Sequence, residues 1–251
     1  MVAITGASRG IGRAVAEAAS ARGASVGLIA RSPSDLEKAA AALTGPSSVA
    51  AADIADPAQL EAALSAIEAA LGPVDILVNN AGIGAFGPYV DAGAELVERL
   101  MRVNFFAAAH AVDAVVGGMT ERRRGHIVML GSIAGRLGAP YEAAYSASKF
   151  AMTGFSEALA VELAPKGVKV SMVHPGPVDT NFFDARGVPY ARRWPRPVTP
   201  QRVAAAVIRS VERERFETMV PGWLQFPTVV RALAPRLYRA GASRATTPSE
   251  A

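Results

Sequence analysis

Short apolar runs alternate with helix-forming stretches about seven times along this 251-residue chain. The first runs cover residues 2–5 and 25–30, and the last covers 216–220. Strands that are separated by helices are typical of a parallel sheet, because each connecting helix returns the chain to the same end of the sheet. The pattern therefore predicts an α/β fold: a doubly wound, seven-stranded parallel sheet with helices on both faces.

The same pattern bears on domain organisation. No linker or repeat divides the sequence, so we expect residues 1–251 to form a single dinucleotide-binding domain. Residues 181–198 show no periodicity, and we interpret them as a substrate loop, because long irregular segments in compact domains are more often functional than idle. Residues 224–240 are predicted to form a C-terminal helical segment.

Composition excludes several classes of site. The chain has no cysteine, which excludes disulfides, thiolate catalysis and cysteine-based metal sites. Its three histidines are not at metal-ligand spacing, so we expect no metal. A net charge of +4 is too small and scattered to indicate nucleic-acid binding. There is no signal-peptide pattern and no uninterrupted apolar run of about 18 residues, and we expect a cytoplasmic protein.

A glycine-rich turn, TGASRGIG at residues 5–12, follows the first apolar run and precedes a helical pattern. Glycines let the backbone approach a ligand closely, and the start of the helix offers free N–H groups and a positive dipole end. The turn is not a P-loop, because Gly-Lys-Ser/Thr is missing. It predicts a phosphate site, the alternative being a simple reversal of the chain.

Arg31 follows the second apolar run. In a dinucleotide-binding fold an acidic residue here would bond the adenosine ribose, whereas an arginine accepts a 2′-phosphate. Arg9, within the glycine turn, adds a second positive charge. The pair favours NADP(H) over NAD(H), the alternative being that Arg31 is a solvated loop residue.

Tyr145 and Lys149 are four residues apart in a stretch that predicts a helix, so their side chains share one face. A neighbouring cation lowers the pKa of a phenol, and such a tyrosine can exchange a proton in catalysis. Most such pairs are solvated bystanders, however. Asn104, an amide in a largely apolar helix, and Ser132, at the carboxyl end of the fifth predicted strand, are the further candidates.

Seven motifs occur in order between residues 2 and 180: TGASRGIG, Asp53, NNAG at 79–82, Asn104, Ser132, YSASK at 145–149 and PGPVDT at 175–180. This ordered set resembles the short-chain dehydrogenases/reductases of the ordinary short type. The resemblance implies a Rossmann-type fold, hydride transfer between a nicotinamide and a carbonyl or secondary alcohol, and a homodimer or homotetramer.

The resemblance also implies residue roles. Tyr145 is the acid/base, Lys149 lowers its pKa and holds the nicotinamide ribose, Ser132 bonds the substrate oxygen, and Asn104 anchors a water in a proton relay. Together with Arg31, the residues expected at the cofactor are Gly6, Ser8, Arg9, Gly10, Ile11, Gly12, Asp53, Ile54, Asn80, Ala81, Gly82, Tyr145, Lys149, Pro175, Gly176, Val178 and Thr180. Asp53 has an alternative role as a helix cap.

Substrate identity is expected to depend on residues 133–141 and 181–194. Their largely apolar side chains predict a hydrophobic ketone or alcohol, with a lipid-like compound among the candidates. The expected substrate contacts are Ser132, Ile133, Leu137, Tyr141 and Phe183. Arg186, Arg192, Arg193 and Arg196 would suit an acidic substrate group, but we favour their being solvated.

Two alternative functions stay open. One is a catalytically silent NADP(H)-sensing binding protein. The other is a membrane-surface reductase of lipid- or steroid-type ketones that uses residues 223–240, where bulky apolar residues are interspersed with arginines. Because Pro235 would interrupt a long helix, we favour a helix packed over the substrate entrance or at a subunit contact.

Overall fold

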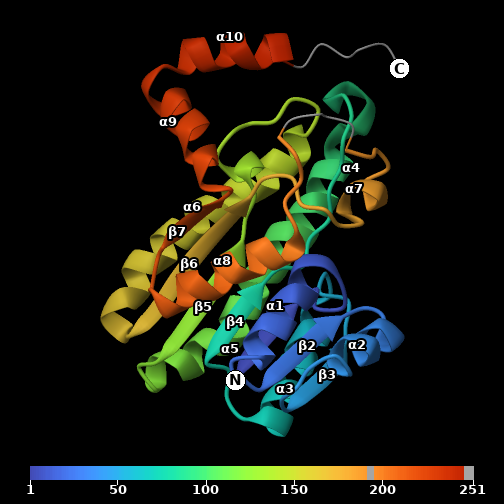
Figure 1. Cartoon of the computed structure of the whole chain (residues 1–251), viewed down its shortest axis with the longest axis vertical. Coiled ribbons are helices and arrows are strands. Elements are labelled where there is room, and N and C mark those ends of the chain that lie inside the picture. Colours follow the sequence, from blue (N-terminus) through green and yellow to red (C-terminus); the bar gives the residue numbers. More distant parts are fainter. Residues whose placement is uncertain (191–194, 246–251) are drawn as a thin grey trace.

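Seven parallel strands form one sheet in the order β3-β2-β1-β4-β5-β6-β7 in a computed structural model that describes residues 1–190 and 195–245 (Figure 1). The strands are β1 Val2–Thr5, β2 Val26–Ala30, β3 Ser47–Ala51, β4 Ile76–Asn79, β5 Gly125–Leu130, β6 Val168–Pro175 and β7 Glu217–Val220. The chain builds outward from β1 in one direction and then from β4 in the other. The doubly wound sheet predicted from the sequence is confirmed, with its switch point between β1 and β4.

Helices cover both faces of the sheet. They are α1 Gly10–Ser20, α2 Pro33–Ala40, α3 Pro57–Leu71, α4 Tyr89–Met101, α5 Ala107–Glu121, α6 Ala143–Leu163, α7 Phe182–Ala185, α8 Pro200–Glu212, α9 Gln225–Leu233 and α10 Pro235–Ala245. Buried side chains of α1, α2 and α8 form the core on one face, and those of α3, α5 and α6 form the core on the other. Wider or tighter helical turns lie at Arg102–Phe106, Ile133–Gly135, Ala164–Lys166 and Gly222–Leu224.

Capping residues explain where several helices begin. The Asp56 carboxylate accepts hydrogen bonds from the backbone N–H groups of Ala58 and Gln59, at 3.0 and 3.2 Å, and Pro57 occupies the first helical position of α3. Ser32 and Thr199 cap α2 and α8 in the same way, each followed by a proline. Such pairs satisfy the free N–H groups of the first turn, so these starts are encoded locally.

The helical run Tyr89–Glu121 has the length and mean hydropathy of a membrane span, and it is the one such run among the residues described. Its apolar residues have another use. In α5, Ala107, Ala111, Val115 and Met119 are buried in the core against the sheet. Packing within the fold therefore accounts for the hydrophobic face of this run.

Strand β6 runs to Pro175, which still pairs with Val220 of β7 although proline has no backbone N–H to donate. Its other neighbour, β5, ends at Leu130, which pairs with Val173. Beyond Val173, β6 therefore continues beside β7. The paired end of β6 brings Pro175 and Gly176 to the same end of the sheet as Ser132.

Candidate active site

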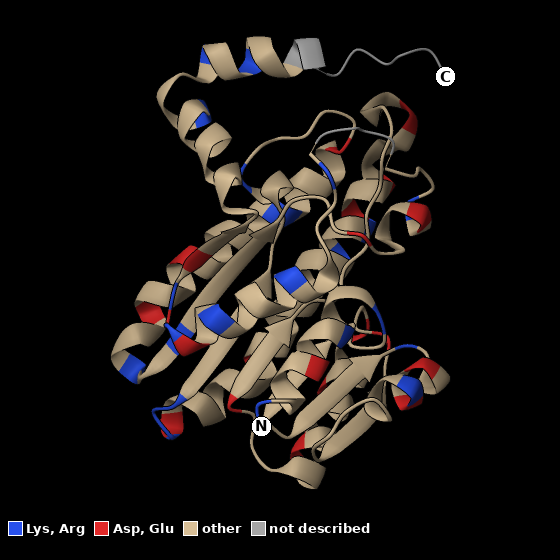
Figure 2. Cartoon of the chain, viewed as in Figure 1, with Lys and Arg blue, Asp and Glu red and all other residues tan. Residues whose placement is uncertain are grey.

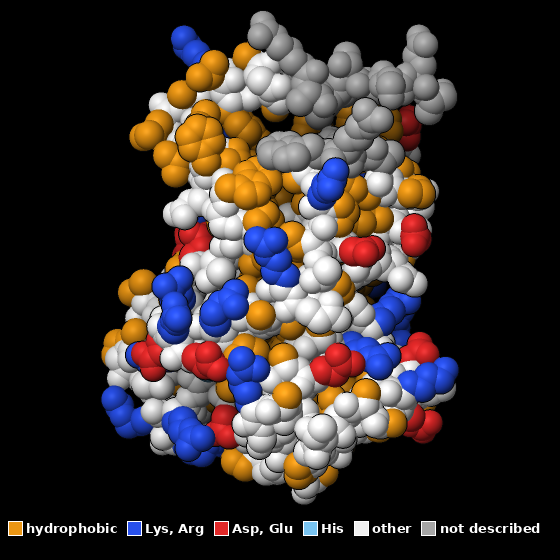
Figure 3. Space-filling model, in the orientation of Figure 1, with side chains coloured by type: hydrophobic (Ala, Val, Ile, Leu, Met, Phe, Trp, Pro, Cys, Tyr) orange, Lys and Arg blue, Asp and Glu red, His pale blue; other side chains and the backbone are white. Residues whose placement is uncertain are grey.

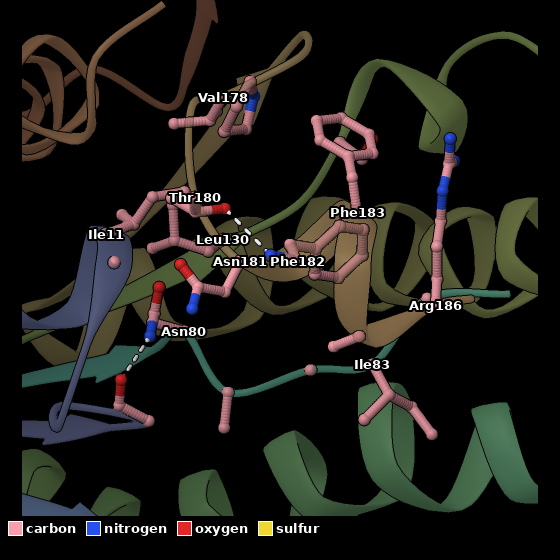
Figure 4. Close-up of a pocket in the computed structure, with 18 of the residues that line it drawn as sticks. Ile11, Asn80, Ile83, Leu130, Val178, Thr180, Asn181, Phe182, Phe183 and Arg186 are labelled. Atoms are coloured by element: carbon pink, nitrogen blue, oxygen red, sulfur yellow. Dashed lines mark hydrogen bonds between the residues drawn. The ribbon is translucent and has the colours of Figure 1, made fainter. Parts of the chain in front are cut away.

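A large cavity opens at the carboxyl ends of β1, β4, β5 and β6, the region where open parallel sheets bind ligands. Its volume is about 1820 Å³. Pockets for a single small molecule usually measure about 300–1,000 Å³, so this cavity has room for a dinucleotide and a second molecule. Figure 4 shows α7 and the residues after β4 and β6 bordering it.

The glycine turn brings the backbone against the cavity. Gly6 and Gly10 have positive φ angles of 68° and 56°, and a Cβ on Gly6 would lie 2.9 Å from the Cα of Ala81. Ser8, Arg9, Gly10 and Ile11 line the cavity. No side chain caps the start of α1, so its first N–H groups face the cavity unsatisfied by a cap. A helix start of this kind fits a pyrophosphate.

Gly12 has a different role from the predicted cofactor contact. It does not line the cavity, because it packs against the turn itself. A Cβ on Gly12 would lie 2.3 Å from the carbonyl oxygen of Gly6. Gly12 therefore allows α1 to approach the glycine turn closely. It shapes the turn without itself lining the cavity.

Thr5, which the motif reading did not single out, ties the glycine turn to the NNAG loop. Its hydroxyl accepts hydrogen bonds from the backbone N–H groups of Asn80 and Ala81, at 3.1 and 3.2 Å. The Asn80 side-chain amide donates to the carbonyl oxygens of Thr5 and Gly6, at 2.9 and 3.1 Å (Figure 4). These bonds hold Asn80, Ala81 and Gly82 at the cavity wall, as predicted.

The far end of the cavity is mixed in charge. Arg9, Arg31, Asp53 and Ile54 all line it, and both arginines are exposed. The Asp53 carboxylate accepts a hydrogen bond from the Ala55 backbone N–H at 3.0 Å, and Asp56, not Asp53, caps α3. Two further charged side chains also line this end, Arg13, which pairs with Glu17 at 2.9 Å, and Asp35 in the first turn of α2.

Helix α6 carries Tyr145 and Lys149 into the middle of the cavity, and both are almost fully buried. The Lys149 ammonium donates a hydrogen bond to the carbonyl oxygen of Leu130 at 2.8 Å and lies 5.9 Å from the centre of the Tyr145 ring. Burial lowers the pKa of Lys149 to about 8. At neutral pH Lys149 therefore stays mostly protonated, although it loses its proton at a lower pH than an exposed lysine does.

The Tyr145 pKa differs from expectation. The sequence reading predicted a lowered value, but burial raises the pKa of Tyr145 well above its usual range, and a hydrogen bond with the Ser132 hydroxyl only partly opposes this. Glu142 raises the pKa further and Arg186 lowers it. Desolvation outweighs the nearby charges, so in the free chain Tyr145 is a neutral phenol that can donate a proton.

A single wide π-helical turn, Arg102–Phe106, holds Asn104 between α4 and α5. The Asn104 amide is fully buried; it accepts from the Ile83 N–H at 2.8 Å and donates to the Ile83 carbonyl and the Ser148 hydroxyl, each at 3.0 Å. Ser148 in turn donates to the Tyr145 carbonyl at 2.8 Å. Asn104 does not line the cavity. Its side chain joins the segment after β4 to α6 through these hydrogen bonds.

The wall beyond β6 and the substrate end are largely apolar. Pro175, Gly176, Val178 and Thr180 line the cavity as predicted, and so do Ser132, Ile133, Tyr141 and Phe183. Leu137 does not. The tight turn Ile133–Gly135 is extended by a hydrogen bond from the Leu137 N–H to the Ile133 carbonyl, and the chain leaves the cavity wall there.

Arg186 is not solvated, contrary to the prediction. Its guanidinium pairs with Glu142 and stacks over the rings of Phe86 and Phe183, 4.9 and 4.6 Å from their centres. The ring of Phe182 lies 5.8 Å from that of Tyr145. Arg186 thus fastens α7 over the substrate end of the cavity. Arg196 is exposed, and Arg192, Arg193 and residue 194 lie outside the described residues.

His174 is the further residue that sequence reasoning missed. It is completely buried behind Ser132, with Nδ1 3.1 Å from the Ser132 carbonyl oxygen and Nε2 3.0 Å from a carboxylate oxygen of Glu217. The hydrogen bond from His174 is the main cause that lowers the pKa of Glu217. Its position within HPGP gave the one available signal, and that pattern indicated only a rigid loop.

Comparison with known proteins agrees with this arrangement. The model of the short chain dehydrogenase family matches residues 1–188. Dehydrogenase/reductase SDR family member 7B of Mus musculus is 33% identical over 261 residues, covering 98% of this chain and 81% of that protein. The 3-ketodihydrosphingosine reductase of Bacteroides thetaiotaomicron is 38% identical over 188 residues, covering 75% of this chain and 67% of that protein.

Solved structures are similar over almost the whole chain. A short chain dehydrogenase/reductase from Burkholderia phymatum in complex with NAD has a TM-score of 0.83 at 27% identity, with 94% of each chain covered. A short-chain dehydrogenase from Sphingobium yanoikuyae in complex with NADPH has a TM-score of 0.81 at 28% identity, covering 100% of this chain and 97% of that one. The chain is an oxidoreductase and belongs to the short-chain dehydrogenase family.

Proposed function

We propose that the protein is an NADP(H)-dependent oxidoreductase that interconverts a hydrophobic carbonyl compound and its secondary alcohol. One observation carries the proposal: a buried phenol, Tyr145, shares a hydrogen bond with the Ser132 hydroxyl beside the buried ammonium of Lys149, at the wall of the cavity. When bound, the nicotinamide supplies or accepts the hydride. The chain supplies orientation and the proton.

The proton comes from Tyr145 in the direction of reduction. Negative charge develops on the substrate oxygen as hydride arrives, and two hydroxyls, those of Ser132 and Tyr145, are placed to donate to it. Because burial keeps Tyr145 protonated, it is ready to act as the acid. The neighbouring positive charge of Lys149 stabilises the phenolate that remains after transfer.

The preference for NADP(H) rests on Arg9 and Arg31. Both line the far end of the cavity, and in the part of the chain that the structure describes neither side chain is engaged in an ion pair. The two solved structures compared above hold different nicotinamide cofactors, so they do not decide between them. Free guanidinium groups at this position match the charge and geometry of a 2′-phosphate.

An apolar substrate is supported by the other end of the cavity. Ile133, Phe86, Phe182 and Phe183 line it, and the cation there, Arg186, is already paired with Glu142. An acidic substrate group would have to compete with that carboxylate. The similarity to a reductase of 3-ketodihydrosphingosine, a ketone by name, agrees with an apolar carbonyl substrate.

Cofactor choice is tested by titrating the purified protein with NADPH and NADH while recording fluorescence. We expect tighter binding of NADPH and loss of that preference in Arg31→Ala. Arg209→Ala is the matched control, since Arg209 is an exposed arginine on α8 away from the cavity. Equal affinity for both cofactors, unchanged in Arg31→Ala, would overturn the cofactor assignment.

Turnover is tested with a panel of apolar ketones and secondary alcohols, following the absorbance of the reduced nicotinamide. Tyr145→Phe is expected to lower the rate by about 10²–10⁴, the usual contribution of a general acid or base. Tyr89→Phe, which changes an exposed tyrosine on α4, should leave the rate unchanged. NADPH binding without turnover of any compound would instead support the cofactor-sensing alternative.

A further inference from the structure

The C-terminal arm, residues 222–245, leaves the body of the protein at the end where the cavity opens (Figure 1). It comprises the turn Gly222–Leu224 and helices α9 and α10. Leu224 is buried at the base of the arm and lines the cavity, but α9 beyond it contributes no buried residue. The sequence predicted a helix packed over the substrate entrance or at a subunit contact, and α9 contacts the body through Arg231 rather than through buried apolar side chains.

An exposed apolar stripe follows this arm. Within α9, Phe226, Val229 and Leu233 are spaced three or four residues apart and share one side of the helix, and the non-helical Ala234 separates them from Leu237 on α10. Figure 3 shows hydrophobic side chains gathered at this end of the molecule. The members and their exposed fractions are Trp223 42%, Phe226 74%, Val229 46%, Leu233 82% and Leu237 68%.

The charge of the arm is of one sign. Residues 218–249 contain four arginines, no lysine and no acidic residue. Figure 2 shows the described basic residues of α9 and α10 without acidic neighbours on these helices. Arg231 anchors the base of the arm: it donates to the Arg136 carbonyl at 3.1 Å and lies over the Phe150 ring at 5.1 Å. Arg236 and Arg239, farther along, are exposed on α10.

We propose that this arm binds an anionic membrane surface. A basic helix with a tryptophan and large aliphatic residues on one side is suited to the boundary between lipid headgroups and acyl chains. Arginines beside such a helix are attracted to anionic lipids. The inference goes beyond the reaction and does not depend on it, since it concerns where the protein docks.

A second copy of the chain is a less suitable partner. Pairing two arms about a two-fold axis would cover both apolar stripes, but it would bring two basic arms into one interface. Like charges in a shared interface oppose association, and no acidic residue of the arm is present to compensate. An anionic lipid surface can both bury the apolar side chains of the stripe and attract the arginines.

The proposal is tested by sedimenting the full chain with vesicles of phosphatidylcholine, with and without phosphatidylserine. We expect binding to the anionic vesicles, much weaker binding to phosphatidylcholine alone, and release by salt. Arg236→Gln/Arg239→Gln should weaken binding more than tenfold, at about fivefold for each arginine lost near such a surface. The control, Arg209→Gln/Arg213→Gln, removes the same charge from exposed positions at the end of α8 and should bind normally.

Phe226→Ser/Leu233→Ser tests the apolar stripe and is expected to abolish binding without unfolding the protein, because both side chains are exposed. Light scattering of each variant accompanies the assay. No sedimentation with anionic vesicles, or equal sedimentation of the α10 variant and its control, would overturn the proposal. A change of oligomeric state in the serine variant would overturn it as well, because it would assign the stripe to a second copy of the chain.

Discussion

The imidazole of His174 donates from Nδ1 to the backbone carbonyl of Ser132 at 3.1 Å, behind the residue that faces the substrate end of the cavity. Nε2 of the same ring faces Glu217, whose carboxylate also pairs with Arg136 at 3.3 Å. His174 thus connects the backbone at Ser132 to charged groups on β7 and after β5.

We expect His174→Gln to lower turnover about tenfold while leaving NADPH affinity unchanged. The loss of the contact to the Ser132 carbonyl would let the Ser132 hydroxyl shift, and small displacements at a reacting centre are costly. The measurement is kcat and KM for the carbonyl substrate beside a cofactor titration. His110→Gln, at an exposed position on α5, is the control. Parallel losses of turnover and cofactor affinity would show that His174 acts through general stability instead.

The lowered pKa of Lys149 predicts that the free energy of unfolding changes with pH in alkaline solution. Its pKa is about 8 in the folded chain, below its ordinary value of 10.5, because it is buried. Between these values the unfolded chain binds more protons than the folded one, so this group makes stability rise with pH. The slope is at most about 1.4 kcal/mol per pH unit. Urea unfolding of the wild type and Lys149→Met from pH 7 to 10 should show the rise in the wild type alone. Parallel curves would contradict the prediction.

Asp35 is expected to limit affinity for NADPH. It lines the same end of the cavity as Arg9 and Arg31, and a carboxylate there repels a 2′-phosphate. Asp35→Asn should tighten NADPH binding severalfold and leave NADH binding unchanged, and the gain should shrink in high salt. Asp91→Asn, on α4 outside the cavity, is the control. An equal change in affinity for both cofactors would show that the substitution alters helix α2 and does not act through repulsion of the 2′-phosphate.

Gly12→Ala should destabilise the protein by about 1–3 kcal/mol, as overpacking does, because its Cβ would meet the Gly6 carbonyl at 2.3 Å. It should also weaken cofactor binding by shifting the glycine turn. Gly117→Ala, within α5 and with nothing near the added Cβ, is expected to stabilise by about 0.5–1 kcal/mol. Thermal unfolding of both variants tests this pair. Similar effects of the two changes would mean that the close approach at Gly12 is not important.

The sheet and the glycine turn could be predicted because they depend on local patterns, whereas most other residues of the cavity wall were predicted from the family resemblance. Apolar runs, Asp56-Pro57 and the glycine turn are short features whose physical reasons lie within a few residues. Contacts such as those of Thr5 with the NNAG loop depend on residues about 75 apart, and the sequence alone does not pair them.

Burial was the other property that spacing could not supply. The four-residue interval placed Tyr145 and Lys149 on one face, but the Tyr145 pKa is dominated by desolvation, which depends on everything packed over that face. The prediction that Arg186 is solvated was wrong for the same reason, because its partners Glu142, Phe86 and Phe183 come from three separate segments. Gly12 was predicted at the cofactor from the family's glycine motif and Leu137 at the substrate from its segment, but neither residue lines the cavity.

The wide turn at Arg102–Phe106 amounts to one residue more than a regular helix would use between α4 and α5. Each residue advances an α-helix by about 100°, so deleting one here would rotate all of α5 relative to α4 or move Asn104 off its partners. A chain shortened by one residue cannot keep both the buried contacts of α5 and the hydrogen bonds between the Asn104 amide and the Ile83 backbone. In this stretch the number of residues is more strongly constrained than their identity. Substitutions should therefore be tolerated at positions where a one-residue deletion is not.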